Sequence, residues 1–390
     1  MDIHNYKRRL DRTLKNIKKS KEILEENKET ILKFKNYLLS EGIGVPRIER
    51  CIGELVKYSK MLKKPFEEAT KNDIRAVIGE LNQTGLAEET KKGFKVIVRK
   101  LYRFIEDIDE KGVYPERVRW ISINIPRSKS KLPEELLTEE EIKKIIQKCN
   151  NPRDKALIAT LAESGCRAGE IGSMQIKHTS FEEYGARLTV DGKTGMRKIL
   201  VVWSSPYLQN WINQHSDNDN SNSPLWIKSD GQQMSYTRIS GVLKTAAKKA
   251  GIKKRVHLHL LRHSRATLLA STMSEACMKQ YLGWGQSSRM CGVYISMCGK
   301  TTDEAVLRAN GVEIKKESNL PVMQPKKCIK CNTTNEATNR FCKICGLVLD
   351  KEEAEKIIEA ETERSLTDNV MDGLIKDPEI LELIKKKISL

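Results

Sequence analysis

SGCRAGEIGSM, residues 164–174, joins two predicted helices and places charged side chains at the joint. The segment before it, PRDKALIATLAESG, has a proline in its first turn and ends at Gly165, which is typical of a helix with a glycine C-cap. Arg167 follows, and Glu170 opens the next predicted helix. An arginine and a glutamate three residues apart are often an exposed ion pair worth under ~1 kcal/mol. This stretch alone therefore does not predict a function, and the other motifs of the chain are needed.

A second charged stretch, HLHLLRHSRAT, spans residues 257–267. His259 and Arg262 lie three residues apart, which places them on one face of a predicted helix, and His263 is adjacent. Taken alone, most HxxR pairs are a solvent-exposed helix face. His263 is interpreted as a packing residue.

Between these two stretches, RLTVDGKTGMRKILVVW (187–203) alternates apolar and polar residues around GKTG. The alternation predicts a β-hairpin or a three-stranded sheet with Lys193 in its turn. Arg197 and Lys198 lie just across that turn and could project in a similar direction.

A fourth stretch, LGWGQSSRMCGVYISM (282–297), contains Tyr294. A tyrosine flanked by Val293 and Ile295 is usually a half-buried packing residue. However, the two charged stretches, Lys193 and Tyr294 follow one another in a fixed order, and that order favours one shared site. We expect Val293 and Ile295 to anchor the helix while the phenol faces the arginines.

Basic residues exceed acidic residues in this chain. Its 390 residues allow two or three domains, and 70 Lys and Arg against 52 Asp and Glu give a formal charge of +18. This excess suits a polyanionic partner, although solvated lysines on any soluble protein would give the same charge. The chain contains no run of ~18 apolar residues that could span a membrane, and the N-terminus lacks the apolar part of a secretory signal. We therefore expect a cytoplasmic protein.

The spacing of apolar residues divides the chain into helical regions. Residues 22–122 read as a bundle of four helices, and INIPRSKSKLPEELL interrupts the periodicity with two prolines. Thr138 and Glu141 then form a capping box that opens a second domain. The expected parts are a basic N-terminal segment (1–21), a helical bundle (22–122), a linker (123–137), a mostly helical domain with one small sheet (138–313), a cysteine-rich segment (326–350) and a helical tail (351–390).

The ten cysteines are unevenly distributed. Four of them form two CxxC pairs separated by ten residues, and the other six show no regular spacing. Four thiolates with this spacing can bind a structural Zn²⁺ tetrahedrally. A segment this short has almost no apolar core, so it needs a bound metal ion to stabilise its fold. Two redox CxxC pairs are the alternative, but the surrounding βαβ pattern is missing. The expected zinc ligands are Cys328, Cys331, Cys342 and Cys345.

The fixed order of motifs resembles the tyrosine recombinase (phage integrase) family. The resemblance is carried by SGCRAGEI, by the GKTG hairpin, by HxxR, by LGW at 282–284 and by VYISM around Tyr294. The segment after LGW and the CxxC pairs are similar to archaeal integrases of that family. The resemblance implies a mainly α (α+β) fold with a core DNA-binding bundle, a catalytic domain with a small antiparallel sheet, and a C-terminal zinc ribbon and helix.

The physical chemistry of DNA cleavage agrees with the resemblance. Two forked guanidinium groups, Arg167 and Arg262, can clamp the phosphate, and their charge can lower the cost of ionising Tyr294. The phenol would become the covalent nucleophile. Tyr281 is the competing tyrosine, but its place just before LGW matches a packing position of the family.

The resemblance also implies roles for other residues. Lys193 would protonate the 5′-oxygen leaving group, with Lys198 as an alternative, and His259 would assist proton transfer. Glu170 would orient Arg167. Trp284 would donate its indole N–H to the phosphate.

We therefore expect a site-specific recombinase that acts on duplex attachment sites as a homotetramer, needs no ATP or catalytic metal, and is associated with the nucleoid. Either residues 300–312 or the amphipathic C-terminal tail could make the protomer contacts, although the tail could instead pack on its own chain. The alternatives are a monomeric type IB topoisomerase-like enzyme and a zinc-ribbon DNA-binding regulator on a decayed recombinase fold.

Overall fold

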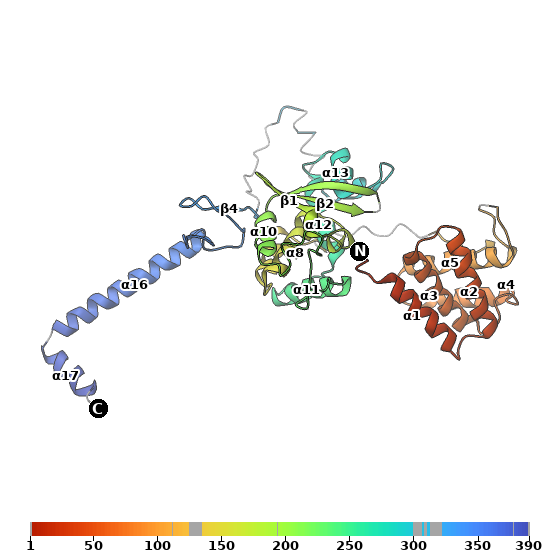
Figure 1. Cartoon of the computed structure of the whole chain (residues 1–390), viewed down its shortest axis with the longest axis horizontal. Helices are drawn as coiled ribbons and strands as arrows, with labels where there is room; N and C mark the ends of the chain where they lie inside the picture. Colours follow the sequence, from red (N-terminus) through yellow and green to blue (C-terminus); the bar gives the residue numbers. More distant parts are fainter. Residues whose placement is uncertain are drawn as a thin grey trace. The chain divides into compact units, whose positions relative to one another are not determined.

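The computed structural model describes residues 2–110, 112–124, 135–192, 194–298, 306–307, 310–312, 322–376 and 378–388. The chain divides into two compact units, residues 2–131 and residues 132–390 (Figure 1). Each unit has its own buried apolar residues, so each is described separately.

The first unit is a helical bundle. Its helices begin and end as hydrogen bonding and capping predict: Pro46 lies in the first turn of its helix, and Thr70 forms a capping box with Asp73. Its described helices are α1 (Tyr6–Lys19), α2 (Glu25–Ser40), α3 (Val45–Leu62), α4 (Lys71–Gln83), α5 (Glu88–Ile105) and α6 (Glu116–Arg119).

Most of the expected basic N-terminal segment, residues 1–21, forms helix α1. Leu10 and Ile17 are buried in the core of the bundle, and Leu14 packs against it. These residues recur at i, i+4 and i+7, so they form one apolar stripe in an otherwise basic sequence. The helix packs against α3 and belongs to the bundle.

The second unit opens with the expected capping box, in which Thr138 accepts a hydrogen bond from the backbone N–H of Glu141. Gly165 ends α8 in the left-handed conformation, with φ of 58°. The described helices up to residue 298 are α7 (Glu139–Gln147), α8 (Pro152–Ser164), α9 (Ala168–Gly172), the short 3₁₀ turn η2 (Ile176–His178), α10 (Ser205–Asn213), α11 (Tyr236–Lys249), α12 (Leu258–Ala270), α13 (Glu275–Leu282) and α14 (Met290–Cys298).

One antiparallel sheet accompanies these helices, in the order β1 (Thr179–Glu182), β2 (Gly185–Gly192) and β3 (Gly195–Val201). The register places Gly192 opposite Gly195, and Thr194 lies in the hairpin turn that joins β2 to β3. Ile199 and Val201 are buried on the face toward the helices, whereas Met196 and Leu200 are exposed. The expected mainly helical fold with one small antiparallel sheet is confirmed.

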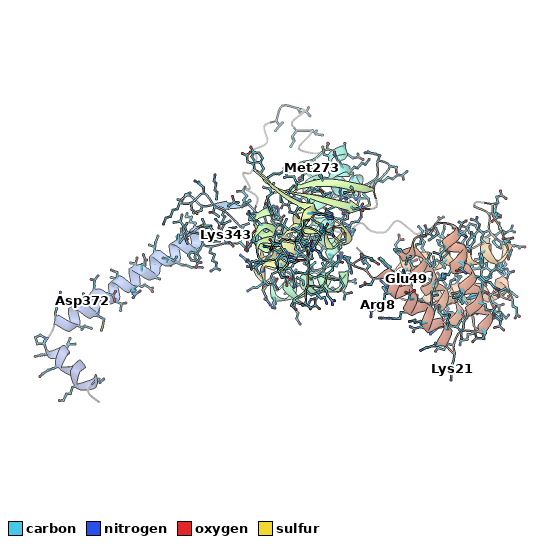
Figure 2. The ribbon with its side chains drawn as sticks, in the orientation of Figure 1. Arg8, Lys21, Glu49, Met273, Lys343 and Asp372 are labelled. Atoms are coloured by element: carbon cyan, nitrogen blue, oxygen red, sulfur yellow. The ribbon has the colours of Figure 1, made fainter. Side chains whose placement is uncertain are left out.

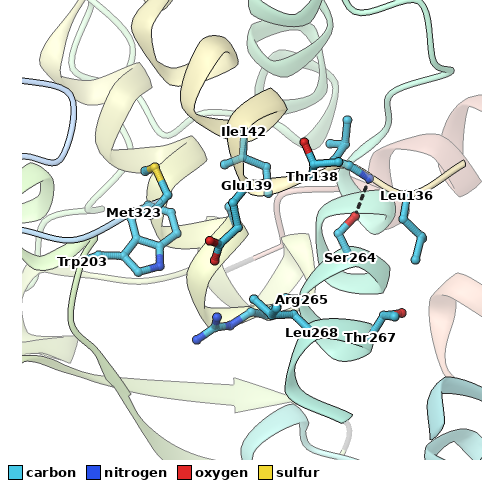
Figure 3. A pocket seen from close by; sticks show the side chains of 12 residues that line it. Leu136, Thr138, Glu139, Ile142, Trp203, Ser264, Arg265, Thr267, Leu268 and Met323 are labelled. Atoms are coloured by element: carbon cyan, nitrogen blue, oxygen red, sulfur yellow. Dashed lines mark hydrogen bonds between the residues drawn. The ribbon is translucent and has the colours of Figure 1, made fainter. Parts of the chain in front are cut away.

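The expected linker lies mostly outside the described residues, which resume at residue 135. Leu136 and Leu137 are buried. The backbone N–H of Leu137 donates to the Ser264 hydroxyl of α12 at 2.9 Å (Figure 3). The chain is therefore fixed to the second domain before α7 begins.

The C-terminal segment contains β4 (Lys326–Lys327), β5 (Thr334–Asn335), α16 (Lys351–Lys376) and α17 (Pro378–Ile388). The two short strands pair antiparallel. Along α16, Ile358, Leu366 and Val370 are exposed by 62%, 61% and 61%, so these apolar side chains are not packed in the described chain. None of the described helices combines the length and the apolar character needed to cross a membrane.

Candidate active site

Arg167 and Glu170 meet at the start of α9, as their spacing predicts. The Glu170 carboxylate accepts hydrogen bonds from the Arg167 backbone N–H at 2.9 Å and from its Nη1 at 2.8 Å. Glu170 is buried, whereas the Arg167 side chain is 35% exposed. The carboxylate therefore caps α9 and holds a guanidinium whose outer side can reach a ligand.

Arg197 of β3 binds the same carboxylate from the other side. Its Nη1 and Nη2 lie 3.1 Å and 2.8 Å from the two Glu170 oxygens, and its Nε donates to the Tyr281 carbonyl at 3.1 Å. Burial raises the pKa of Glu170, but the hydrogen bonds and charge of Arg197 and the contacts of Arg167 outweigh it, so the pKa stays below its usual value. Glu170 is thus a buried anion between two cations.

Arg197 holds the Glu170 carboxylate in place, whereas the sequence indicated only that it could project in a direction similar to Lys193. Its strand alternates, so Arg197 shares the inward face with Ile199 and Val201. Lys198 lies on the opposite, exposed face, where its charge acts on Glu182. The side chain of Lys198 therefore projects away from Glu170.

Gly283 is the point where three segments meet. Its carbonyl accepts from Arg167 Nη1 and Nη2 at 3.3 Å each and from Thr194 Oγ1 at 3.4 Å. Its φ is +62°, and a Cβ there would lie 2.5 Å from Arg197 Nη1, so only glycine fits. The hairpin turn is therefore beside Arg167. Lys193 precedes Thr194 in the sequence and lies outside the described residues.

Arg262 projects from α12 and is 2% exposed. Its Nη1 donates to the Gly165 carbonyl at 2.9 Å, and its Nη2 donates to the Leu282 carbonyl at 2.7 Å. Burial and then the charge of Arg167 lower the pKa of Arg262 to about 10, which still leaves it protonated at neutral pH. Arg262 thus joins the ends of α8 and α13.

Tyr294 lies on the buried side of α14 and is 2% exposed. Its ring stacks on Trp284 with centroids 5.4 Å apart and an interplanar angle of 7°. The Arg262 guanidinium carbon lies 5.5 Å from the Trp284 ring centroid. Burial raises the pKa of Tyr294, and the charge of Arg262 opposes that rise. The phenol, the indole and the buried arginine therefore form one cluster.

The expected anchoring by Val293 and Ile295 is wrong. These two side chains are 41% and 38% exposed, whereas Cys291 and Tyr294 are buried. Adjacent residues of a helix are rotated by about 100° from one another, so the neighbours of a buried residue leave the buried face. The anchor of α14 is the i, i+3 pair that includes Tyr294 itself.

His263 contacts the phenol directly. Its Nδ1 lies 2.5 Å from the Tyr294 hydroxyl oxygen, and the two ring centroids are 5.8 Å apart. The exposed His259 ring packs edge to face on His263 at 4.5 Å. The sequence predicts a packing residue at position 263. The available signal for another role was its position four residues after His259, which places both histidines on one face of α12.

Tyr281 is directed elsewhere. Its hydroxyl donates to the Leu200 carbonyl at 3.3 Å and to the Glu163 carbonyl at 3.4 Å. Burial raises the pKa of this phenol well above its usual value. Tyr281 therefore links β3 to α8, as a packing residue would.

The four cysteines of the C-terminal segment form a candidate metal centre. Their Sγ atoms all lie within 4.8 Å of one another, with Cys328 to Cys345 and Cys331 to Cys342 at 3.5 Å each. Tetrahedral zinc with Zn–S bonds of about 2.3 Å requires sulfur atoms about 3.8 Å apart. The donor set and its spacing fit one tetrahedral ion.

An apolar pocket of about 250 Å³ lies on the other side of α12 (Figure 3). Ser264, Arg265 and Leu268 line it from that helix, and Leu136 and Met323 line it from other segments. Since Arg262 and His263 point away from this face, the pocket is separate from the candidate active site.

Comparison with known proteins identifies the domain that carries the site. Residues 135–297 match the model of the phage integrase family. Tyrosine recombinase XerA of Pyrococcus furiosus is 29% identical over 307 residues, covering 75% of this chain and 95% of that protein. Tyrosine recombinase XerD of Bifidobacterium longum is 24% identical, covering 70% of this chain and 93% of that protein.

Solved structures show the same fold. XerH site-specific recombinase, bound to palindromic difH substrate in a post-cleavage complex, has a TM-score of 0.55 at 17% identity and covers 79% of this chain and 97% of its own. A lambda integrase dimer bound to a COC′ core site has a TM-score of 0.55 at 17% identity and covers 70% of this chain and 77% of its own. Residues 135–297 therefore match the phage integrase family, and the chain is similar to tyrosine recombinases over 70% to 75% of its length.

Proposed function

We propose that this protein is a site-specific DNA recombinase that cleaves and rejoins duplex DNA through a covalent phosphotyrosine at Tyr294. The observation that carries the proposal is the cluster around the phenol: His263 at 2.5 Å, Trp284 stacked on the ring, and the buried cation of Arg262 over the indole. The half-exposed Arg167 is joined to this cluster through Gly283, next to Trp284. A phosphate that reaches both arginines would meet the tyrosine hydroxyl.

In the proposed reaction the Tyr294 oxygen attacks phosphorus, and the bond between phosphorus and the 5′-oxygen breaks. The phenol proton passes to Nδ1 of His263, and the released 5′-oxygen takes a proton to become a hydroxyl. Ionising a free tyrosine at pH 7 costs about 4 kcal/mol, and burial increases that cost here. A proton acceptor in contact with the hydroxyl is therefore needed beside the arginines.

The other site residues would either stabilise the charge on the phosphate or assist proton transfer. Arg167 and Arg262 would neutralise the charge that develops on the non-bridging oxygens, with Glu170 and Arg197 positioning Arg167. Lys193 would protonate the 5′-oxygen, a role supported by Thr194, the next residue of the turn, lying beside Gly283. His259 would support His263, and Trp284 would hold the phenol and contact the phosphate.

A nicked duplex tests the proposal. Cleavage near the nick releases a short oligonucleotide, so the covalent complex accumulates because the 5′-hydroxyl needed for rejoining diffuses away. We expect the native chain to form this complex and Tyr294→Phe to bind the duplex without forming it. An equal yield of adduct from Tyr294→Phe would refute the assignment. The absence of any adduct from the native chain would instead favour the DNA-binding regulator.

The architecture of the reaction is also a proposal. Residues 22–122 would clamp the duplex, and four protomers would act on two attachment sites in the cytoplasm, on nucleoid DNA. Strand exchange between two duplexes distinguishes this recombinase from a monomeric topoisomerase-like enzyme, which would relax supercoils only. The mass of the complex on paired attachment sites tests the tetramer directly.

We further propose that Cys328, Cys331, Cys342 and Cys345 hold one structural zinc ion. The close approach of their sulfur atoms supports this donor set. Bound zinc would staple a segment with few buried apolar side chains. We expect one zinc per chain in the native protein and its loss in the Cys328→Ser, Cys331→Ser double variant. Native protein that is folded and free of zinc would contradict the proposal.

A further inference from the structure

The cysteine-rich segment docks on the catalytic domain at α10. The Tyr207 hydroxyl lies 2.7 Å from Thr338 Oγ1, and the Asn210 side chain donates to Glu336 Oε1 at 2.9 Å. Glu336 is 4% exposed and Tyr207 is 1% exposed. Buried polar groups paired with their partners fix one docking geometry, so the surface across this junction is a defined one.

A cleft of about 560 Å³ lies at this junction, and its cations come from both sides. Lys148 and Lys155 line it from the end of α7 and from α8, and Arg340 and Lys343 line it from the cysteine-rich segment (Lys343 is labelled in Figure 2). None of the described residues that line the cleft is a carboxylate. Four cations facing one hollow repel one another unless an anion binds there.

The nearby carboxylates offset only part of the positive charge of the cleft. Glu336 is buried beside it, and although burial raises the pKa of Glu336, the Asn210 hydrogen bond and the charges of Lys155 and Lys343 oppose that rise. Arg340 pairs with Glu353 at 3.1 Å, but its side chain is 62% exposed, so that pair contributes little. Lys148 and Lys343 are exposed. They can turn toward a ligand.

The cleft is distant from the candidate active site. Lys148 and Lys155 flank the first turn of α8, whereas the Gly165 carbonyl at the far end of that helix binds Arg262. The rise of about 1.5 Å per residue separates the two ends of the helix by roughly 18 Å. A B-form duplex rises about 3.4 Å per base pair, so a ligand that spans both places is at least about five base pairs long.

We propose that this cleft binds the sugar–phosphate backbone of duplex DNA that flanks the cleaved site. The inference rests on the proposed function, because that function supplies the ligand. A duplex held at the active site presents its flanks to the cleft at a high effective concentration. Lysines on one wall, an arginine and a lysine on the other, and the amide residues Gln147 and Asn339 in the same lining match a row of phosphates rather than one base. The cysteine-rich segment would thereby extend the DNA-binding surface.

The test measures how binding depends on salt. Each phosphate contact adds about 0.9 to the slope of log affinity against log salt. The double variant Lys148→Gln, Lys343→Gln removes two cations, and Lys330→Gln removes the matching lysine of the other CxxC motif, which does not line the cleft. All carry Tyr294→Phe, so that only binding is measured, and zinc content and thermal unfolding show that each is folded.

We expect the double variant to reduce the slope by about two on duplexes with long flanks and to leave it unchanged on a duplex limited to the core site. The Lys330→Gln control should match the parent on both. An unchanged slope on flanked duplexes would overturn the proposal and favour an acidic protein as the occupant. An equal reduction of the slope on the core duplex would also overturn the proposal, because the lysines would then contact DNA within the core site and not its flanks. The adduct assay with the native tyrosine is independent, so a failed cleft and a failed recombinase are distinguishable.

Discussion

The two halves of the candidate site are built differently. Around Glu170, charged groups bind one another: Arg167 and Arg197 share one buried carboxylate at 2.8 to 3.1 Å. Around Tyr294, aromatic packing dominates, and its contacts join α14 to His263 of α12 and to Trp284, which follows α13. In the first half, the shared carboxylate holds two guanidinium groups in place. In the second half, packing holds and covers the phenol of Tyr294.

Arg262 belongs to both halves, so its removal should have the largest effect. We expect Arg262→Ala to slow covalent complex formation by about 10² to 10³-fold, because a cation aimed at the developing charge is lost. Single-turnover cleavage of the nicked duplex measures the rate. Arg262→Lys is the matched control: it keeps a charge but lacks the fork that binds the Gly165 and Leu282 carbonyls. A cleavage rate for Arg262→Ala equal to that of the native chain would separate this arginine from the chemistry.

His263 tests the tyrosine half alone. Removing a proton acceptor typically slows a reaction by about 10² to 10⁴-fold, and we expect His263→Ala to lie near the lower limit. The pH profile distinguishes this role from packing. Without His263 the phenol must lose its proton to solvent, so the remaining rate should rise steadily with pH. His259→Ala serves as the comparison and should slow the reaction less. A uniform loss of rate with an unchanged pH profile would indicate that His263 only packs.

The Glu170→Gln variant tests the ion pairs around Glu170, and the measured quantity is the free energy of unfolding. The folded pKa of Glu170 is lowered, so its charge stabilises the fold above the unfolded pKa of about 4.3, and that stabilisation is lost as the pH falls through the folded value. Leaving Arg197 buried without its anion should cost about 3 kcal/mol near pH 7. Denaturant unfolding at several pH values measures the difference between the two chains, which should shrink in acid. A difference that is constant from pH 7 to pH 3 would contradict the ion-pair account.

Tyr281→Phe should have the smallest effect. Its hydroxyl binds two carbonyls outside the Tyr294 cluster, so its removal should cost about 1 kcal/mol of stability. Cleavage rates should stay close to those of the native chain. Loss of cleavage in a folded Tyr281→Phe protein would show that the two tyrosines are not separate as described.

The sequence predicted the parts of the site that depend on local rules. Helix caps at Thr138 and Gly165, the hairpin around residue 193 and the pairing of Arg167 with Glu170 all follow from neighbours within a few positions. Long-range packing was not predictable in the same way. The anchoring role of Val293 and Ile295 was misjudged because apolar residues that flank a tyrosine do not reveal which face of a helix is buried. Arg197 and His263 gained their roles from partners 27 and 31 residues away.

The basic segment at the N-terminus shows the same limit. Its charge led to the prediction of a basic segment apart from the bundle, whereas three apolar residues at helical spacing place α1 in the bundle. The many basic residues of this segment reflect the exposed face of α1, whereas the helical spacing of its apolar residues marks the buried face.

The central claim is that Tyr294, and not Tyr281, becomes bonded to DNA. Digestion of the complex trapped on a nicked duplex, followed by mass spectrometry of the peptide that carries the nucleotide, identifies the residue. We predict that the nucleotide remains on the peptide that contains Tyr294 and that the Tyr281 peptide is unmodified. A nucleotide attached to Tyr281, or to any residue outside α14, would contradict the account.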